Sequence, residues 1–142
     1  IFGFKSCLLM KYNTYGLASP PKTIADAKKL PVSVLLGSVI IPTLNSNGFN
    51  RLTERTNAFK MVNMLTNNAI SAIAESRIVH RYYWKKAGLS IDKIQLGPKI
   101  GGQYKIYIAG NKTFPKDIAE QIREAFTRAL QSGSIKKVKS RW

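Results

Sequence analysis

The chain has 142 residues, 44% of them hydrophobic, so it is long enough for one domain with a continuous core and too short for two ordinary ones. This apolar content also argues against disorder over most of the length. Lys and Arg number 23 against 7 Asp and Glu, a formal net charge of +16, which first suggests nucleic acid as a partner. Because the basic residues are scattered, except for a dense group within 136–141, we expect a solvated surface and no nucleic-acid partner.

The rare residue types exclude several kinds of site. Cys7 is the only cysteine and His80 the only histidine, so an internal disulfide and a structural zinc site are excluded. His80 lies in a polar, helix-like stretch, where we expect it to be exposed and not catalytic. No cofactor and no metal ion are predicted. No window reaches the run of about twenty apolar residues that a membrane span needs, and the nearest run, 35–41, is broken by Gly37.

The N-terminal part predicts a strand and then a short helix. Residues 4–12 have an extended pattern that ends in a polar turn at 13–16. Thr23 and Asp26 have the spacing of a capping box, so we expect a helix that starts there and ends before Pro31.

A buried strand follows at residues 32–36, a short apolar run with β-branched members. Gly37-Ser38 stops this strand, as in a parallel strand that leads into a helix. That next helix is expected to be irregular because it contains Pro42.

The next helix is expected to begin with Thr56 or Asn57 as its N-cap and to end at 67–68. A second short strand is predicted at 70–74. The apolar face of the helix is formed by Ala58, Met61, Val62 and Leu65.

Residues 76–87 return to a helical pattern, with Gly88 as the C-terminal cap. Strands are then expected at 91–96 and 104–108, separated by a turn at 97–99. Because strands and helices alternate, the sequence predicts an α/β fold with a mostly parallel sheet.

The clearest helical signal lies at the end of the chain, where Pro115 suits a first turn and Gly133 terminates the helix. A short second helix carries Ile135, Val138 and Trp142 on one side. The long helix has an apolar stripe formed by Ile118, Ile122, Ala125, Phe126, Ala129 and Leu130, which must pack on something.

Five segments, taken in order, resemble one known family. The first, 19–38, has a short helix, a strand and then Gly-Ser, and the second, 64–73, is similar to the family pattern Leu-x-x-Gly-Arg-Val-Asp-Ala, which 85–89 continues. The fourth, 101–109, is similar to the strand that returns to the first lobe. The last, 129–142, has the family's terminal pattern of Ala-Leu, Gly-Ser and a final Trp. In this order they resemble the second lobe and C-terminal tail of a family 3 bacterial extracellular solute-binding protein, the periplasmic substrate-binding component of an ABC transporter.

This resemblance implies an α/β lobe like that of periplasmic binding proteins, with a mostly parallel sheet flanked by helices. Residues 1–18 would then be a hinge strand entering from a missing first lobe, 19–102 the second lobe, and 103–142 the return strand and the C-terminal helices that belong to the first lobe. Because the chain starts at Ile1 and the first lobe should precede it, we expect a fragment or a truncated form.

The candidate site lies at the first predicted βα turn. Ligands of open α/β sheets bind beyond the carboxyl ends of the strands, where backbone N–H groups can hold an anion. Gly37, Ser38, Val39 and Ile40 occupy that position, with the Ser38 hydroxyl and the three N–H groups of 38–40 as donors. The alternative is that Gly37-Ser38 only forms a tight turn.

The resemblance implies two further ligand contacts, and both differ here. Amino-acid binders of the family have a polar residue after the Ser or Thr and an acid at the end of the next strand that holds the α-ammonium group. This sequence has Val39 and Ser76 at these positions, with Glu75 expected to face the other way. Without the acid, an apolar or anionic solute is expected rather than an ordinary amino acid, and residues 39–42 would form an apolar wall.

The predicted function is the capture of a small solute for membrane transport in the periplasm or outside the cell. No enzyme activity is expected, because no acid–base pair lies near Ser38 or Ser76. The expected partners are the solute, an ABC transporter permease, and the missing first lobe or a second copy of the chain. The alternatives are a basic domain that binds nucleic acid or an anionic surface, and a ligand-sensing domain of the same fold.

Overall fold

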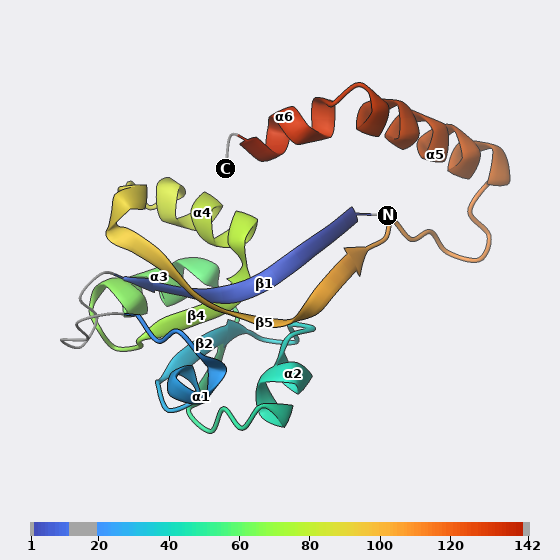
Figure 1. The fold of residues 1–142 in the computed structure, drawn as a ribbon. Helices are drawn as coiled ribbons and strands as arrows, with labels where there is room; N and C mark the ends of the chain where they lie inside the picture. Colours follow the sequence, from blue (N-terminus) through green and yellow to red (C-terminus); the bar gives the residue numbers. More distant parts are fainter. Residues whose placement is uncertain (1, 12–19, 141–142) are drawn as a thin grey trace. The chain divides into compact units, whose positions relative to one another are not determined.

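The computed structural model describes residues 2–11 and 20–140 (Figure 1). The chain divides into two compact units, which are treated separately below. One is an α/β unit of residues 3–105, and the other is a C-terminal unit that contains the chain from residue 106 onward.

The α/β unit is built around a five-stranded sheet of order β3-β2-β4-β1-β5. Strand β2 pairs in parallel with both β3 and β4, whereas β1 pairs antiparallel with β4. This confirms the expected α/β fold with a mostly parallel sheet flanked by helices. The elements in chain order are β1 (Phe2–Lys11), α1 (Ile24–Ala27), β2 (Val32–Leu35), α2 (Ile41–Ser46), β3 (Leu52–Arg55), α3 (Ala58–Thr66), β4 (Ala72–Ser76), α4 (Arg77–Lys86), a 3-10 turn (Ile91–Lys93) and β5 (Ile94–Ile106).

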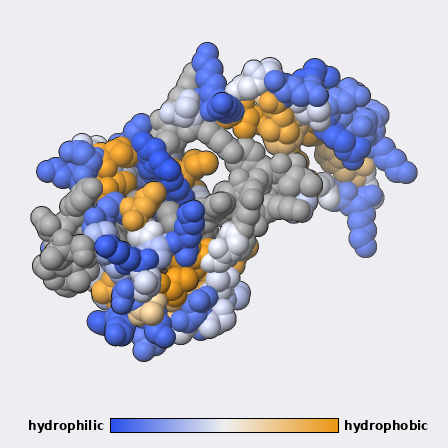
Figure 2. All heavy atoms as spheres, in the orientation of Figure 1, coloured by the Kyte–Doolittle hydropathy of each residue, from blue (hydrophilic) through white to orange (hydrophobic). Residues whose placement is uncertain are grey.

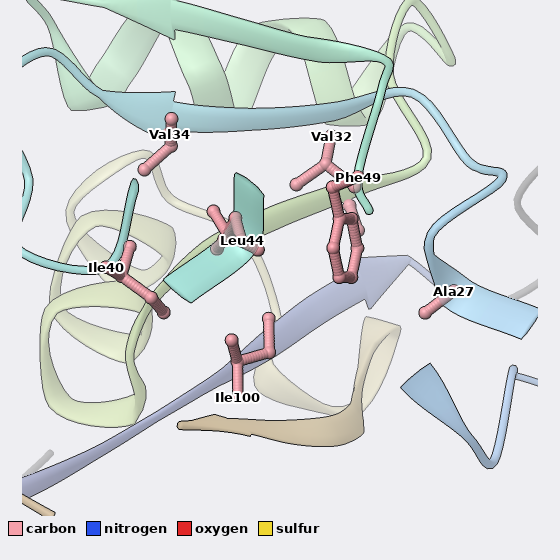
Figure 3. Packing of buried hydrophobic residues seen from close by; sticks show 9 residues of the cluster. Ala27, Val32, Val34, Ile40, Leu44, Phe49 and Ile100 are labelled. Atoms are coloured by element: carbon pink, nitrogen blue, oxygen red, sulfur yellow. The ribbon is translucent and has the colours of Figure 1, made fainter. Parts of the chain in front are cut away.

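Two hydrophobic clusters cover the two faces of this sheet, because successive side chains of a strand point to opposite faces. Ala72 and Ala74 of β4 belong to one cluster, and Ile73 between them belongs to the other. The cluster under α1 and α2 contains Ala27, Val32, Val34, Ile40, Leu44, Phe49, Ala72, Ala74 and Ile100 (Figure 3). The cluster under α3 and α4 contains Met61, Val62, Leu65, Ile70, Ile73 and Trp84.

Two of the predicted helix starts are confirmed at the level of hydrogen bonds. The Thr23 hydroxyl accepts from the Asp26 N–H at 3.2 Å, as a capping box requires. The Asn57 side-chain oxygen accepts from the N–H groups of Phe59 at 2.8 Å and Lys60 at 3.3 Å. These side chains satisfy donors that a helix start leaves unpaired, and so fix where α1 and α3 begin.

Two strands differ from the sequence prediction. Strand β3 was not predicted, because Leu52–Arg55 is short, mostly polar and at the edge of the sheet, where no apolar run is needed. Strand β5 runs without a break from Ile94 to Ile106, so the predicted turn at 97–99 is wrong. Pro98 is tolerated there because β5 is the other edge strand, where a missing backbone donor need not break the pairing.

Three further predictions on this unit are corrected, and one cannot be compared. Pro42 lies in the first turn of α2, where its missing N–H costs no helical bond, so the helix is not made irregular. The strand predicted at 70–74 lies at Ala72–Ser76. His80 is buried, with 3% exposure, because it lies one turn before buried Trp84 on the inner face of α4. The predicted turn at 13–16 lies outside the described residues.

The C-terminal unit contains α5 (Lys116–Gln131) and α6 (Ser134–Ser140). Pro115 is the N-cap of α5, and Gly133, with a φ of 73°, follows its end. No residue of α5 is buried, so the predicted apolar stripe is left largely uncovered. Within the described ranges 2–11 and 20–140, no helix has the length and apolar character needed to cross a membrane.

The core assignment leads to a stability prediction with a matched control. Leu44 is fully buried against β2, whereas Leu36 is 63% exposed. Leu44→Ala should therefore reduce the free energy of unfolding by about 2–5 kcal/mol, and Leu36→Ala should change it by less than about 0.5 kcal/mol. Urea titration followed by circular dichroism measures both values. Equal losses in the two variants would contradict the assigned core.

Candidate functional site

The chain turns sharply where β2 ends. The Ser38 N–H donates to the Leu35 carbonyl at 3.0 Å, and the Leu36 N–H donates to the Arg55 carbonyl at 2.9 Å. Between these donors, Gly37 has a φ of 72°, a left-handed conformation that an L side chain rarely adopts. The tight turn expected at Gly37-Ser38 is therefore present, and its shape depends on the glycine.

This turn leaves three backbone donors without a hydrogen bond. Within the described part of the chain, the N–H groups of Gly37, Val39 and Ile40 make no hydrogen bond. The Ser38 N–H, predicted as a ligand donor, is instead used inside the turn. The Ile41 N–H is also used, because it donates to the Ser38 carbonyl at 3.1 Å. The loop can therefore offer N–H groups to an anionic group without breaking bonds of its own.

The side chains of this loop divide into an outer and an inner set. Leu36 and Val39 are exposed, at 63% and 64%, so they could contact a bound molecule. Ile40 is 1% exposed and packs in the core under α1 and α2 (Figure 3). Because the whole residue is buried, neither its N–H nor its side chain is open to a ligand, and Ile40 is not part of an exposed apolar wall.

Ser76 lies at the carboxyl end of β4 and has a structural role. Its hydroxyl oxygen accepts from the Val79 N–H at 3.3 Å, which makes Ser76 the N-cap of α4. Only 6% of the residue is exposed. A helix cap needs an oxygen at this position, which explains why a serine is suitable here without any ligand.

Glu75 points to the opposite face of the sheet from Ser76, as strand alternation predicts. It lines a small gap with Met61, Ile73 and His80 on the side of α3 and α4. The burial of this carboxyl raises its pKa above the ordinary value of 4.5, although the Ser76 N–H, which donates to its Oε1 at 2.9 Å, works in the other direction. Glu75 is therefore an acid kept apart from the loop after β2.

The sheet order places the loop and Ser76 at a topological switch point. From β2 the chain moves outward to β3, and then crosses back over β2 to β4 on its other side (Figure 1). The connections therefore diverge to the two faces at the carboxyl ends of β2 and β4. Open α/β sheets bind their ligands at such a point, because the diverging loops leave a crevice between them.

The charged groups nearest to this edge include two arginines. Arg55 is the last residue of β3 and pairs in register with Leu35, and Arg77 is the first residue of α4. Among residues 2–11 and 20–140, neither forms an ion pair. Glu54 precedes Arg55 on β3, and by strand alternation Arg55 points to the same face as Leu35 and Glu75, so the edge carries charges of both signs. Sequence reasoning missed these two arginines, because β3 was not predicted and Arg77 was taken only as part of a helix.

The predicted residues thus form one group at the carboxyl edge, with one exception. Gly37, Ser38, Val39 and Ile40 form the loop after β2, and Ser76 ends β4 beside it in the sheet order. Glu75 is at the same edge but turned to the other face. In the described part of the molecule, no group of His, Cys, Asp or Glu side chains could hold a metal ion.

Comparison with known proteins identifies the fold. No protein-family model and no curated protein sequence matches the chain. Among solved structures, the chain is similar to a mutant of the arginine-binding protein ArgBP from T. maritima, with 15% identity and a TM-score of 0.70. It is also similar to a histidine kinase sensor domain that resembles periplasmic binding proteins, with 9% identity and a TM-score of 0.73.

A third similar structure is the arginine-, lysine- and histidine-binding protein ArtJ from Geobacillus stearothermophilus, with 16% identity and a TM-score of 0.67. Each alignment covers 99% of this chain but only 58–59% of the other one, so the chain spans less than two thirds of their length. These similarities show that the chain has the fold of periplasmic binding proteins. The three structures are two binding proteins and a sensor domain.

The raised pKa of Glu75 gives a pH-dependent prediction. An acid whose folded pKa lies above its unfolded value contributes most stability below the unfolded value, and this contribution is lost as the pH rises through the folded pKa. Glu75→Gln keeps an oxygen for the Ser76 N–H and removes the ionisation. The variant should therefore be more stable than the wild type at about pH 7, by a margin that shrinks towards pH 4.

Thermal unfolding as a function of pH measures this margin. Glu54→Gln, at an exposed position on β3, is the control and should leave the free energy of unfolding within about 0.5 kcal/mol of the wild type. If the stability margin of Glu75→Gln over the wild type stays constant from pH 4 to pH 7, the ionisation of a buried Glu75 is not the cause of that margin.

Proposed function

We propose that this chain is the second lobe and C-terminal tail of a family 3 extracellular solute-binding protein, and that it captures a small solute for membrane transport. In this assignment, 1–18 is a hinge strand, 19–102 is the second lobe, and 103–142 returns to the first lobe. The observation that carries the proposal is the loop after β2, where two exposed residues, Gly37 and Val39, have unbonded N–H groups at the switch point of the sheet. The similarity to amino-acid-binding proteins of the same fold supports it.

The solute that this loop would hold carries a carboxylate or a similar anionic group. Gly37 and Val39 would donate their N–H groups to it, and the exposed side chains of Leu36 and Val39 would contact its apolar part. Arg77, the first residue of α4, supplies positive charge at the edge. Because Glu75 is turned away and Ser76 is used as a cap, an ammonium group on the solute would gain no partner from this face.

The other wall of the site would come from a first lobe or from a second copy of the chain. Delivery to an ABC transporter permease, in the periplasm or at the cell surface, completes the proposed role. A ligand-sensing role is the second candidate, and the similarity to a histidine kinase sensor domain supports it. Both roles use the same solute site, so one binding experiment tests their common basis.

The experiment is a titration of the 15N-labelled chain with succinate, L-glutamine and L-arginine, followed by NMR. We expect saturable shifts of the Gly37, Val39 and Ile40 amide signals at millimolar solute. Succinate should bind at least as tightly as L-glutamine, because the loop offers donors for a carboxylate and no acid for the ammonium group.

Gly37→Ala tests whether the loop causes this binding, and Gly88→Ala is the matched control. Both glycines have a φ of 72° and no atom near an added Cβ, so each substitution should cost a similar stability, about 1–2 kcal/mol. Only Gly37→Ala should weaken succinate binding, by about tenfold or more. Equal binding by the two variants, or shifts confined to residues away from the loop, would refute the proposed site.

A further inference from the structure

Helix α4 begins with a cation. Arg77 is its first residue and its first turn has no acid, although the helix dipole favours negative charge there. Helices α1 and α5 follow the usual rule, with Asp26 and Asp117 in their first turns. Arg81 follows Arg77 one turn later on α4. The positions of the two arginines are therefore not explained by helix stability, and they indicate an interaction outside the helix.

The charge on α4 is not balanced by its neighbour α3. The two helices contain no acid, and their five basic residues are Lys60, Arg77, Arg81, Lys85 and Lys86. Before α4, Glu75 lines the small gap beneath α3 and α4. After α4, the Asp92 carboxylate accepts from the Ser90 hydroxyl. Among residues 2–11 and 20–140, neither Arg77 nor Arg81 forms an ion pair, so this surface has a net positive charge.

Arg81 is partly withdrawn from water. The residue is half-buried, and its Nε is buried with no hydrogen-bond partner among the residues that the structure describes. A partly buried cation without a counter-charge costs free energy, which an anion from another molecule would offset. Arg81 therefore differs from the fully solvated cations of this chain.

The outer face of α4 has uncharged side chains between its cations. Residues four apart lie on the same side of a helix, so Ile78 and Tyr82 form one row, and Arg81 and Lys85 form the row beside it. Ile78 and Tyr82 are half-buried, and they lie away from Trp84, which is buried on the inner face. Figure 2 shows hydrophilic side chains over much of the α/β unit, with apolar ones between them. The outer face of α4 thus combines cations with side chains that can leave water.

The aromatic rings beside these cations favour a lipid surface over a nucleic acid. The Lys86 Nζ lies 5.8 Å from the centroid of the Phe59 ring and 5.5 Å from that of the Tyr82 ring. Tyr83 packs edge-to-face against Phe59 at 5.2 Å and against Tyr82 at 5.0 Å. Because the rings pack on one another and on Lys86, they are used within the protein and not as a platform for stacking bases. Tyrosine near cations is instead typical of the boundary between lipid headgroups and water.

We propose that the outer face of α4 binds an anionic phospholipid surface. Arg81 and Lys85 would contact lipid phosphates, and Ile78 and Tyr82 would lie between the headgroups. The net charge of +16 adds long-range attraction to such a surface. This interaction goes beyond the proposed solute capture and does not depend on it, because lipid binding requires neither the loop after β2 nor a solute.

Sedimentation with vesicles tests the proposal on the complete 142-residue chain. The vesicles contain phosphatidylcholine alone, or phosphatidylcholine with about 30% phosphatidylglycerol. We expect binding to the anionic vesicles only, and weaker binding as the salt concentration rises. Arg81→Gln combined with Lys85→Gln should lower the partition constant by about 25-fold, since each cation at such a surface contributes about fivefold.

Lys22→Gln combined with Lys29→Gln is the matched control. It removes the same charge from exposed positions beside α1, on the other face of the sheet. The partition constant of this variant should stay within about threefold of the wild type, because charges far from the contact are screened. If the α4 double variant fails to fold, as judged by circular dichroism, Lys85→Gln alone should still weaken binding by about fivefold.

Three results would overturn the proposal. The first is no binding to the anionic vesicles, even if the chain binds duplex DNA. The second is equal weakening by the two double variants, because overall charge and not α4 would then cause the binding. The third is unchanged binding by the folded α4 variant, which would place the contact elsewhere, as on the basic group within 136–141.

Discussion

The parallel pairing of β2 with β3 on one side and β4 on the other is the interaction on which the α/β unit depends. Val32 and Val34 of β2 are fully buried, and the two connections that leave and re-cross this strand cover opposite faces of the sheet. Open α/β sheets bind their ligands where such connections diverge, which in this unit is at the carboxyl ends of β2 and β4. The position of the candidate site therefore follows from the burial of one short strand.

Gly37 determines the chemistry of this edge more than any side chain that could contact a ligand does. Gly37 takes a left-handed conformation, which turns the chain within four residues and commits the Ser38 N–H to the Leu35 carbonyl. The donors that follow it are then left unbonded. Glu75 lies at the same edge, but strand alternation turns it to the other face of the sheet. The unbonded N–H groups of this loop are the feature on which the proposal of an anionic solute is based.

Local signals allowed much of this fold to be predicted from the sequence. The caps at Thr23 and Asn57 and the apolar face of α3 depend on neighbouring residues only, and they are present as predicted. Strand β3 and the continuous β5 could not be predicted, because an edge strand is held by pairing with distant residues and needs no apolar run. His80 was placed wrongly because the polar residues around it hid the inner face of α4.

The candidate site, too, could be predicted only where it depends on neighbouring residues. Its location at Gly37-Ser38 could be predicted from a strand followed by a turn, whereas the use of the Ser38 N–H and the burial of Ile40 depend on the packing of α2. The cap made by Ser76 and the place of Arg55 likewise required the three-dimensional structure. Sequence patterns identified the loop, and the fold determined which of its groups are available.

The measurement that tests this account most directly is a crystal structure of the chain grown with saturating succinate. The account predicts a carboxylate of the solute at the carboxyl edge of β2, with an oxygen about 2.7–3.2 Å from the backbone nitrogen of Gly37 or Val39. Ordered succinate at the amino edge of the sheet, or Gly37 and Val39 N–H groups that bond to protein atoms instead, would contradict it.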